Sequence, residues 1–197
     1  MHDVSNDAGE DRKPDFPGIF LVGYRGSGKS VVGGELAELL GRPFVDTDER
    51  VVARAGVSIA EIFAGRGEAA FREAESQALA ELVQRIEAGE PLVVATGGGL
   101  VLAPSNVRAL RGAGIVVWLD ADVTTLRGRI GADPASAASR PILSGQSSVD
   151  EVEAVLEVRR PLYERASQLR LASDAKSPRE LAQSIVSRLN TLRRGPR

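Results

Sequence analysis

An eight-residue segment, Gly-Tyr-Arg-Gly-Ser-Gly-Lys-Ser at residues 23–30, constrains the fold of this chain more than any other feature. It matches the pattern G-x-x-x-x-G-K-[ST] and directly follows an apolar run. Its glycines let consecutive backbone N–H groups converge on phosphate oxygens at the start of a helix. Lys29 would then reach the outer phosphates, and Ser30 would bind Mg²⁺. The segment predicts a strand, a phosphate-binding loop and a helix that bind a nucleoside triphosphate. The alternative is a glycine-rich turn with an incidental lysine.

Short apolar runs alternate with longer amphipathic stretches along the chain. The runs have the length and the Gly or Asp boundaries expected of strands buried on both faces. They occupy residues 19–22, 43–45, 92–95, 115–119 and 169–172. Apolar residues at helical spacing predict helices at 29–40, 67–88, 107–111 and 151–165. Three capping boxes mark helix starts, at Ser58/Glu61, Ser148/Glu151 and Ser177/Glu180. This alternation predicts an α/β fold, with a five-stranded parallel sheet and helices on both faces.

The composition excludes several kinds of site. Cysteine is absent and His2 is the one histidine, so disulfides, zinc sites built on Cys or His, and Ser-His-Asp triads are not expected in the folded part. The 25 Lys and Arg residues nearly balance the 27 Asp and Glu residues, which argues against nucleic acid as a partner. No run approaches the ~18 apolar residues of a membrane helix. A proton acceptor near neutral pH is therefore expected to be a carboxylate, or else a Lys or Tyr.

The length of 197 residues fits one compact domain with a tail. Residues 1–15 carry a net charge of −3 and few large apolar side chains, so we expect a disordered acidic tail before a domain at 16–197. The tail lacks the basic start and apolar core of a secretion signal, which favours a cytoplasmic location. Residues 131–148 consist mostly of Gly, Ala, Ser and Pro. A loop of this length is usually a functional lid or a disordered segment.

Two strand ends offer a carboxylate for a metal ion. Asp46 and Asp48 follow the second apolar run, and like charges this close need a cation or hydroxyl donors between them. Asp120 follows the fourth run, but a lone Asp at this place is most often a helix N-cap, which the sequence Asp120-Ala-Asp122 fits. The pair is therefore the preferred metal and acceptor site, with Asp48 as a simple N-cap as the alternative.

Arginines at loop edges and element ends suggest an anionic acceptor. Arg72, Arg140 and Arg159 are candidates for bidentate contacts to a carboxylate or phosphate, although each alone is more often a solvated surface residue. Three other arginines are expected on the surface: Arg12, Arg66 and Arg193. The three glycines at residues 97–99 close the third strand, where they would let a ligand press against the backbone. An ordinary loop is the alternative there.

Taken together, these features resemble the shikimate kinase family, which are small P-loop kinases of the nucleoside monophosphate kinase type. The resemblance runs from about residue 16 to residue 192. Its motifs stand in the family's order: Gly-Tyr-Arg-Gly-Ser-Gly-Lys-Ser (23–30), Phe-Val-Asp-Thr-Asp (44–48), Ile-Phe, Gly-Glu and Phe-Arg (within 62–72), Gly-Gly-Gly (97–99), Arg-Pro-Ile-Leu (140–143) and Arg-Arg-Pro-Leu-Tyr (159–163). The resemblance implies a three-layer P-loop NTPase fold with a substrate-binding section at about 47–75 and a mobile lid at 131–148. It also implies ATP-dependent phosphorylation of the 3-hydroxyl of shikimate, with Mg²⁺, on the route to chorismate and the aromatic amino acids.

The resemblance further implies roles for particular residues. ATP would be bound by the phosphate loop, a lid arginine and a loop beside the adenine: Gly26, Ser27, Gly28, Lys29, Ser30, Val31, Arg140, Lys176 and Pro178. Shikimate would be bound by an aspartate, two arginines and the three glycines: Asp48, Arg72, Arg159, Gly97, Gly98 and Gly99. Ser30 would bind Mg²⁺ directly and Asp46 through water. Catalysis would rest on Lys29, on Asp48 as the proton acceptor, and on Arg140 closing over the transferring phosphate.

Neighbouring residues complete this expectation. Glu75 would orient the arginine one turn before it. A second lid arginine could be Arg127 or Arg129. Arg160 next to Arg159 raises a question of register, which the spacing Arg-x-Pro-Leu-Tyr resolves in favour of Arg159.

Two other functions remain as alternatives. A gluconate kinase-like enzyme would also take an acceptor with a carboxylate and hydroxyls, but the motif at 44–48 and the triple glycine argue against it. A non-catalytic module that senses a ligand is the second alternative, and the joint presence of Lys29, Ser30, Asp46 and Asp48 argues against it. The expected molecule is a monomer that acts on ATP and shikimate, with no nucleic acid or membrane partner.

Overall fold

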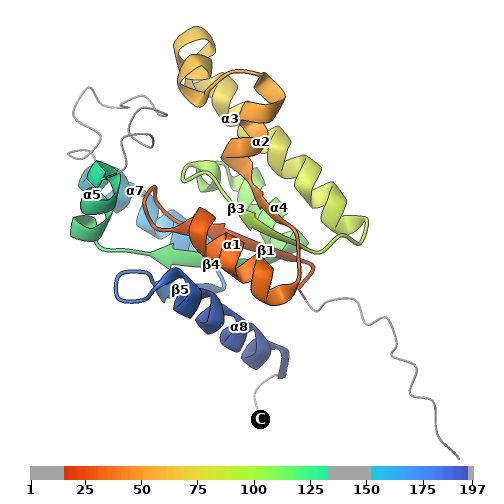
Figure 1. Ribbon diagram of the computed structural model, residues 1–197. Helices are drawn as coiled ribbons and strands as arrows, with labels where there is room; N and C mark the ends of the chain where they lie inside the picture. The colour runs from red at the N-terminus through yellow and green to blue at the C-terminus, as the bar shows by residue number, and fades with distance from the viewer. Residues whose placement is uncertain (1–15, 133–151, 195–197) are drawn as a thin grey trace, which may run out of the picture.

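The computed structural model describes residues 16–132 and 152–194 and places five parallel strands in one sheet. The strands are β1 (Gly18–Val22), β2 (Phe44–Asp46), β3 (Leu92–Ala95), β4 (Gly114–Asp120) and β5 (Leu169–Ala172), and their order is β2-β3-β1-β4-β5 (Figure 1). Each coincides with one of the apolar runs, so the predicted sheet is confirmed. The tail at 1–15 and most of the predicted lid lie outside the described residues.

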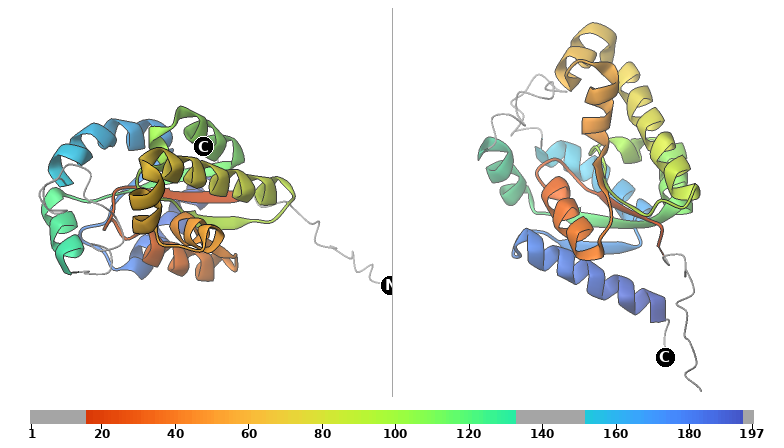
Figure 2. Two further views of the ribbon diagram at one scale, coloured as in Figure 1. Left: turned by 90° about the horizontal axis from the view of Figure 1, so that it is seen from above. Right: turned by 45° about the vertical axis from the view of Figure 1, so that its right-hand side comes forward.

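Eight helical elements surround the sheet. They are α1 (Lys29–Leu40), α2 (Thr47–Ala55), α3 (Ile59–Glu87), η1 (Leu100–Leu102), α4 (Pro104–Ala113), α5 (Val123–Ala132), α7 (Val152–Ala166) and α8 (Pro178–Arg194) within the described ranges. α1 and α8 lie together on one face of the sheet, and α3, α4 and α7 cover the other (Figure 2). The predicted three-layer arrangement, with helices on both faces, is therefore confirmed.

The alternation of side chains along each strand explains the two faces. In β1, Phe20 and Val22 belong to the core beneath α3, α4 and α7, whereas Ile19 and Leu21 belong to the core beneath α1 and α8. Successive side chains of a strand point to opposite faces, so a run of four apolar residues fills both layers. The central strands β1 and β3 are buried along their whole length. This burial requires every residue of the run to be apolar.

Helix α3 is longer than the predicted helix at 67–88. It begins at the predicted capping box, where the Ser58 and Glu61 side chains each bond the other's backbone N–H. It then bends at Gly67, whose backbone angles (φ 77°, ψ 174°) are not helical. The capping box of Ser177 and Glu180 is also present. The third box, at Ser148, lies outside the described residues.

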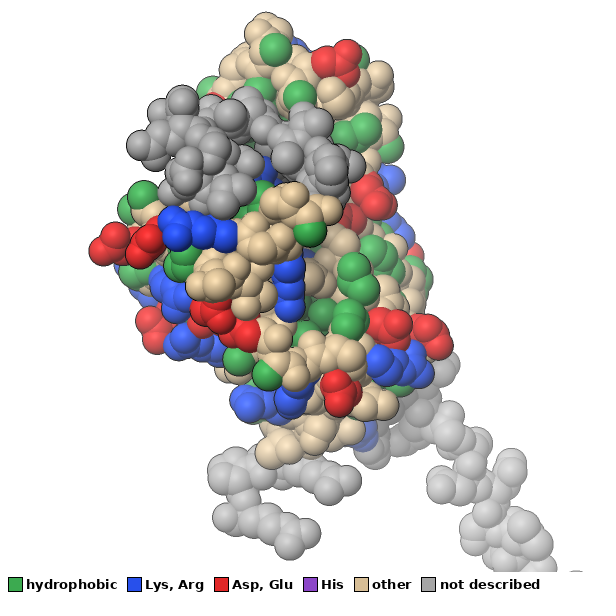
Figure 3. Space-filling model, turned by 60° about the vertical axis from the view of Figure 1, so that its left-hand side comes forward, with side chains coloured by type: hydrophobic (Ala, Val, Ile, Leu, Met, Phe, Trp, Pro, Cys, Tyr) green, Lys and Arg blue, Asp and Glu red, His purple; other side chains and the backbone are tan. Residues whose placement is uncertain are grey.

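The surface of the domain carries charged side chains of both signs (Figure 3). Basic and acidic side chains are interspersed over the face drawn in Figure 3. Ion pairs between charged side chains also join elements, as in the pair of Arg179 on α8 with Glu35 on α1 at 2.8 Å. Exposed pairs of this kind each add little to stability. No helix in the described part of the chain is long and apolar enough to cross a membrane.

Candidate active site

The phosphate loop joins β1 to α1 and leaves the first N–H groups of α1 without a side-chain cap. Gly28 is the N-cap residue of α1, and no side chain bonds to the helix start. Gly28 (φ 90°) and Gly26 (φ 80°) have left-handed backbone angles that L side chains rarely adopt. Ser27 between them is buried. The uncapped N–H groups and the positive end of the helix dipole make this place suited to a phosphate.

Lys29 is the first residue of α1, and its side chain folds back over the loop. Its Nζ donates a hydrogen bond to Tyr24 O at 2.8 Å and lies 3.5 Å from Ser27 Oγ. The ammonium group is therefore held against the first half of the phosphate loop, next to Tyr24 and Ser27. Val31, two residues later, has an exposed side chain.

The two candidates for a second lid arginine make different contacts. Arg129 of α5 donates from Nη1 to Gly26 O at 3.2 Å and from Nη2 to Ser173 O at 2.7 Å. It therefore ties the phosphate loop to the segment that follows β5. Arg127 lies 3.4 Å from Glu153 of α7. Arg129 thus touches the phosphate loop directly.

The remaining residues predicted at the nucleotide lie at the end of the chain or outside the described ranges. Lys176 Nζ donates to Ser184 Oγ at 2.9 Å, and Pro178 is the first residue of α8. Arg140 belongs to the residues that the structure does not describe. Its predicted place over the transferring phosphate stays a prediction.

Asp46 lies between the phosphate loop and α2. Its Oδ2 accepts a hydrogen bond from Ser30 Oγ at 2.6 Å, and its Oδ1 accepts from the backbone N–H of Asp48 at 2.9 Å. Asp46, rather than Asp48, is thus the N-cap of α2. Asp48 is the second residue of that helix, half-buried, with Oδ1 shielded from solvent. The two carboxylates have separate surroundings: one faces the loop, the other the turn after β3.

The oxygen atoms of Ser30 and Asp46 fit the requirements of Mg²⁺. Mg²⁺ prefers hard oxygen ligands, keeps several waters, and is held in nucleotide sites by one or two protein groups plus phosphates. A hydroxyl and a carboxylate oxygen 2.6 Å apart at the start of α1 provide such a partial set. The residues described contain no cluster of three or more acidic, His or Cys side chains that would hold a metal by itself. The site is thus suited to a metal that arrives with the nucleotide.

The three glycines at 97–99, called the glycine turn below, are the point where several elements meet. The N–H of Gly97 donates to Thr47 Oγ1 of α2 at 2.8 Å. A Cβ added to Gly97 would collide with Glu75 Oε1 of α3 and would lie 2.7 Å from Asp48 Oδ1. A Cβ added to Gly98 would lie 3.3 Å from the carbonyl of Gly23 in the phosphate loop. A side chain at Gly97 would displace Glu75 and Asp48, and one at Gly98 would press on the phosphate loop, so glycine allows α2, α3 and the phosphate loop to approach closely.

Arg72 of α3 reaches the same turn. Its Nη1 donates to Glu75 Oε2 at 2.6 Å, and its Nη2 and Nε donate to Glu68 Oε1 at 2.8 and 3.1 Å. A Cβ on Gly99 would lie 2.7 Å from Arg72 Cζ. Burial alone would lower the pKa of Arg72, but the charges and hydrogen bonds of Glu75 and Glu68 outweigh it and raise the pKa further. The guanidinium therefore stays charged, and the buried Glu75 holds it in place, as the sequence predicts.

Arg159 of α7 also contacts the glycine turn. Its Nη1 lies 3.3 Å from Gly98 O, and its guanidinium lies over the Tyr24 ring at 5.8 Å. Only 9% of Arg159 is exposed, which is unusual for an arginine. Tyr163, one turn later, donates from its hydroxyl to the same carbonyl at 2.6 Å. The structure thus brings two arginines, from α3 and α7, to one turn.

Asp120 is not a helix N-cap, and its carboxylate pairs with two arginines. The N-cap role belongs to Asp122, whose Oδ1 accepts from Thr125 N at 2.7 Å. Asp120 ends β4 and pairs with Arg170 of β5 at 2.6 Å and with Arg160 of α7 at 3.4 Å. Two guanidinium groups therefore neutralise its charge. The N-cap reading of Asp120 was wrong because the arginines that pair with it lie 40 and 50 residues away in the sequence.

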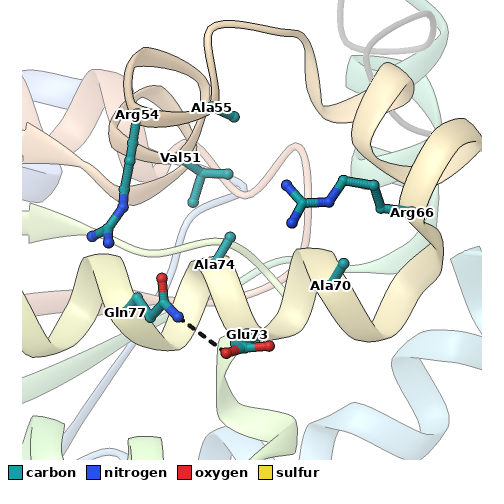
Figure 4. A pocket seen from close by; sticks show the side chains of 8 residues that line it. All are labelled: Val51, Arg54, Ala55, Arg66, Ala70, Glu73, Ala74 and Gln77. Carbon is teal, nitrogen blue, oxygen red and sulfur yellow. Dashed lines mark hydrogen bonds between the residues drawn. The ribbon is translucent and has the colours of Figure 1, made fainter.

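A cavity of about 220 Å³ between α2 and α3 contains none of the predicted site residues. Small or apolar side chains line it from both helices, Val51 from α2 and Ala70 and Ala74 from α3, and Arg66 points into it from α3 (Figure 4). Arg66 is exposed, as the sequence predicts. The site described above is therefore defined by contacts around the glycine turn and not by this cavity.

The sequence does not predict three contacts of the site. Thr47 bonds the glycine turn, Arg129 bonds the phosphate loop, and Tyr163 bonds Gly98 O. Thr47 and Tyr163 each stand inside a motif of the family resemblance, which is the signal that could have found them. Arg129 is one of the two candidates for a second lid arginine, but its bonds are to backbone carbonyls, which no sequence pattern marks.

Comparison with known proteins adds to this geometry. The family model for shikimate kinase matches residues 25–190. The chain belongs to the shikimate kinase family. A shikimate kinase from Symbiobacterium thermophilum is 46% identical over 171 residues, which cover 87% of this chain and 95% of that protein. One from Synechococcus sp. (strain RCC307) is 41% identical over 90% of this chain and 87% of that protein.

Solved structures agree with the family. A shikimate kinase from Acinetobacter baumannii, in complex with shikimate, is similar with a TM-score of 0.82 and 36% identity, over 90% of this chain and 94% of that chain. A gluconokinase from Sinorhizobium meliloti has a TM-score of 0.55 and 22% identity. At this low identity, the likeness to the gluconokinase indicates a shared fold and nothing beyond it. The shikimate kinase fold expected from the motifs is confirmed.

Proposed function

We propose that this member of the shikimate kinase family transfers the γ-phosphoryl group of ATP to the 3-hydroxyl of shikimate, giving 3-phosphoshikimate and ADP on the route to chorismate. The observation that carries the proposal is the glycine turn. There α2 brings Asp48, α3 brings Arg72 and α7 brings Arg159 beside the phosphate loop. An acceptor with one carboxylate and several hydroxyls fits such a set, because the arginines bind the acid and the aspartate binds hydroxyls.

The phosphate loop supports the role of ATP. Backbone N–H groups from Gly26 to Ser30 would surround the β-phosphate, joined by Val31, and Lys29 would leave Tyr24 O to reach the γ-phosphate. Ser30 and Asp46 would hold Mg²⁺, the first directly and the second through water. When bound, Mg²⁺ supplies charge neutralisation between the β- and γ-phosphates. The residues Lys176 and Pro178 are proposed to lie beside the adenine.

The acceptor side supports an in-line transfer. The carboxylate of shikimate would lie between Arg72 and Arg159, with backbone donors of the glycine turn. Asp48 would accept the proton of the 3-hydroxyl while that oxygen bonds to the γ-phosphorus and the bond to the bridging oxygen of ADP breaks. Arg140 would neutralise the transferring phosphoryl group, in a lid at 131–148 that excludes water. Residues 47–75 form the proposed substrate-binding section.

The arrangement supports a gluconate kinase or a ligand-sensing module less well than it supports a shikimate kinase. A gluconate kinase would need the same arginine pair for its acid, but the likeness to a gluconokinase is one of fold alone. A module that only senses ligands needs neither a carboxylate at the acceptor hydroxyl nor the bond of Ser30 to Asp46. A monomeric state remains our prediction.

A coupled assay of ADP release tests the proposal. The protein is incubated with ATP and Mg²⁺, together with shikimate, quinate or gluconate in parallel, or with no acceptor. We expect ADP release in amounts equal to the shikimate added, with gluconate no faster than the reaction without acceptor. Faster release with gluconate would support the other kinase, and no release with any acceptor would support the sensing module.

A further inference from the structure

Some backbone N–H and C=O groups of the glycine turn are hydrogen-bonded within the protein and others are not. The N–H of Gly97 bonds a side chain of α2, and the carbonyls of Gly97 and Gly99 accept the bonds that begin η1. The carbonyl of Gly98 accepts instead from α7, from the Tyr163 hydroxyl at 2.6 Å and from Arg159 Nη1 at 3.3 Å. Within the part of the chain that the structure describes, the N–H groups of Gly98 and Gly99 donate no hydrogen bond.

The carbonyl of Gly98 and the N–H of Gly99 belong to the same peptide group. This peptide is trans, so its C=O and N–H bonds point in opposite directions. Holding the carbonyl against α7 therefore directs the Gly99 N–H away from α7. The Arg72 guanidinium lies against Gly99, since a Cβ there would be 2.7 Å from Arg72 Cζ. The N–H and the guanidinium are thus neighbouring donors, as a carboxylate requires.

The core fixes the position of the Tyr163 hydroxyl. Tyr163 is fully buried, and its ring centroid lies 5.9 Å from that of Trp118 in β4. The same helix is tied to the sheet by Arg160, which contacts Asp120 and donates to Ala121 O at 3.2 Å. A hydroxyl held in this way constrains its acceptor before any ligand arrives.

We propose that Tyr163 is a positioning residue for the acceptor site. Its hydroxyl holds the Gly98–Gly99 peptide so that the Gly99 N–H, beside Arg72, is presented to the carboxylate of the acceptor. The inference rests on the proposed function and gives a task to the last residue of the Arg-Arg-Pro-Leu-Tyr motif. Tyr163 acts through the turn and touches no substrate.

The Tyr163→Phe variant tests this role, because it keeps the ring and removes the donor. We expect the shikimate Kd from calorimetry and the KM for shikimate to rise about 10-fold, the effect of one hydrogen bond to a buried group. The KM for ATP and kcat are expected to stay within about two-fold. Leu110→Ala is the matched control: it removes a buried side chain of the same core from α4, lowers Tm, and leaves the shikimate Kd within about two-fold. An unchanged shikimate Kd in Tyr163→Phe, or an equal loss for ATP, overturns the proposal.

A second measurement uses the unaltered protein, so it does not depend on a variant that folds. In a ¹⁵N-glycine-labelled sample, adding shikimate is expected to move the Gly99 amide signal downfield and slow its exchange. The Gly97 amide, already bonded to Thr47, is expected to change little. A Gly99 amide that does not respond overturns the inference.

The assay of ADP release separates this failure from failure of the proposed function. A protein that phosphorylates shikimate while its Gly99 amide stays unchanged contradicts the positioning role alone. A protein that neither binds nor phosphorylates shikimate contradicts the proposed function. In that case the positioning role is tested without ligand: if the hydroxyl holds the peptide, Tyr163→Phe should speed hydrogen exchange of the Gly99 amide. Unchanged exchange would contradict the positioning role as well.

Discussion

Arg72 shows how single residues of the site depend on their neighbours. Its guanidinium pairs with the buried Glu75 and with Glu68, and these carboxylates raise its pKa although burial opposes this. The charge that would bind an acid is therefore held in one orientation before binding. Asp46 is fixed in the same way by Ser30 and by a backbone N–H. Preorganised charges of this kind lose little freedom when a ligand arrives.

Removing the Arg72 side chain is expected to separate the two substrates. Arg72→Ala should weaken shikimate binding by about 10²-fold, because a charge-assisted pair of hydrogen bonds is lost. The Kd for ATP should stay within about two-fold. Calorimetry with each ligand measures both, and Arg66→Ala, an exposed arginine of the same helix, is the matched control. Equal losses for both ligands in Arg72→Ala would contradict the assignment.

Asp48→Asn keeps the shape of the side chain and removes the proton acceptor. We expect kcat to fall by about 10²–10⁴-fold, the usual contribution of a general base. Single-turnover kinetics with saturating shikimate check this without interference from binding. A change of only a few-fold would mean that Asp48 positions the hydroxyl without accepting its proton.

The two strand-end aspartates can be compared directly. Asp46→Asn should raise the Mg²⁺ concentration for half-maximal rate by about 10-fold, the lower end of the effect of losing a residue that orients a metal site. Asp120→Asn should raise it little, since that carboxylate is paired with Arg170 and Arg160. Titrating the rate with Mg²⁺ at fixed ATP measures both variants. A larger effect of Asp120→Asn than of Asp46→Asn would contradict this assignment and favour Asp120, at the end of β4, as the residue at the metal.

At the scale of elements, the strands could be predicted and two helices could not. Each strand is a run whose members are all apolar, a signal that needs no knowledge of the fold. Helix α2 was not expected as a separate element because only Thr47 and Val51 of its nine residues are buried. Helix α5 buries only Leu126 and Ile130. A short helix that buries only two residues has too few apolar positions to show the 3.6-residue periodicity of a helix in the sequence.

The site could be predicted only where its motifs are local in sequence. The phosphate loop, Arg72 with Glu75, and the glycine turn were all expected from adjacent residues. The meeting of α2, α3 and α7 at the turn required the fold, because Gly97 and Thr47 are 50 residues apart and Gly98 and Tyr163 are 65 apart. The alternative of Asp48 as an N-cap is wrong, because Asp46 both ends β2 and caps α2.

The capping box of α3 leads to a prediction about pH. The pKa of Glu61 is lowered by hydrogen bonds from the Ser58 side chain and backbone, so this contribution to stability is present above the unfolded pKa of about 4.5 and is lost as the pH falls through the lower folded pKa. Ser58→Ala should lower Tm by about 2–4 °C at pH 7. Calorimetric scans at pH 7 and pH 3 should show a smaller difference at pH 3. A difference that grows on acidification would contradict the box.

At the scale of the whole molecule, the sheet order brings the phosphate loop and the glycine turn together. β1 and β3 are neighbours in the order β2-β3-β1-β4-β5, and each carries a loop at its carboxyl end. Parallel sheets of this kind bind ligands at that edge. The site therefore depends on strand order, which brings the phosphate loop and the glycine turn side by side, and α2, α3 and α7 add Asp48, Arg72 and Arg159 to it.

Nucleotide binding should stabilise the entire domain. At about 100 times its Kd, a non-hydrolysable ATP analogue with Mg²⁺ is expected to raise Tm by about 5–10 °C, because it binds the folded state only. Lys29→Ala should lose most of this rise while keeping the Tm of the ligand-free protein within a few degrees. Scanning fluorimetry measures both proteins. An unchanged Tm of the unaltered protein would contradict a working phosphate loop.

The central claim is that one turn of three glycines gathers the groups that hold the acceptor against the nucleotide. A crystal structure with ADP, Mg²⁺ and shikimate bound tests it most directly. We predict the shikimate carboxylate between the guanidinium groups of Arg72 and Arg159, and its 3-hydroxyl at Asp48, facing the phosphate loop. Density for shikimate at another place, with both arginines turned to solvent, would contradict the account.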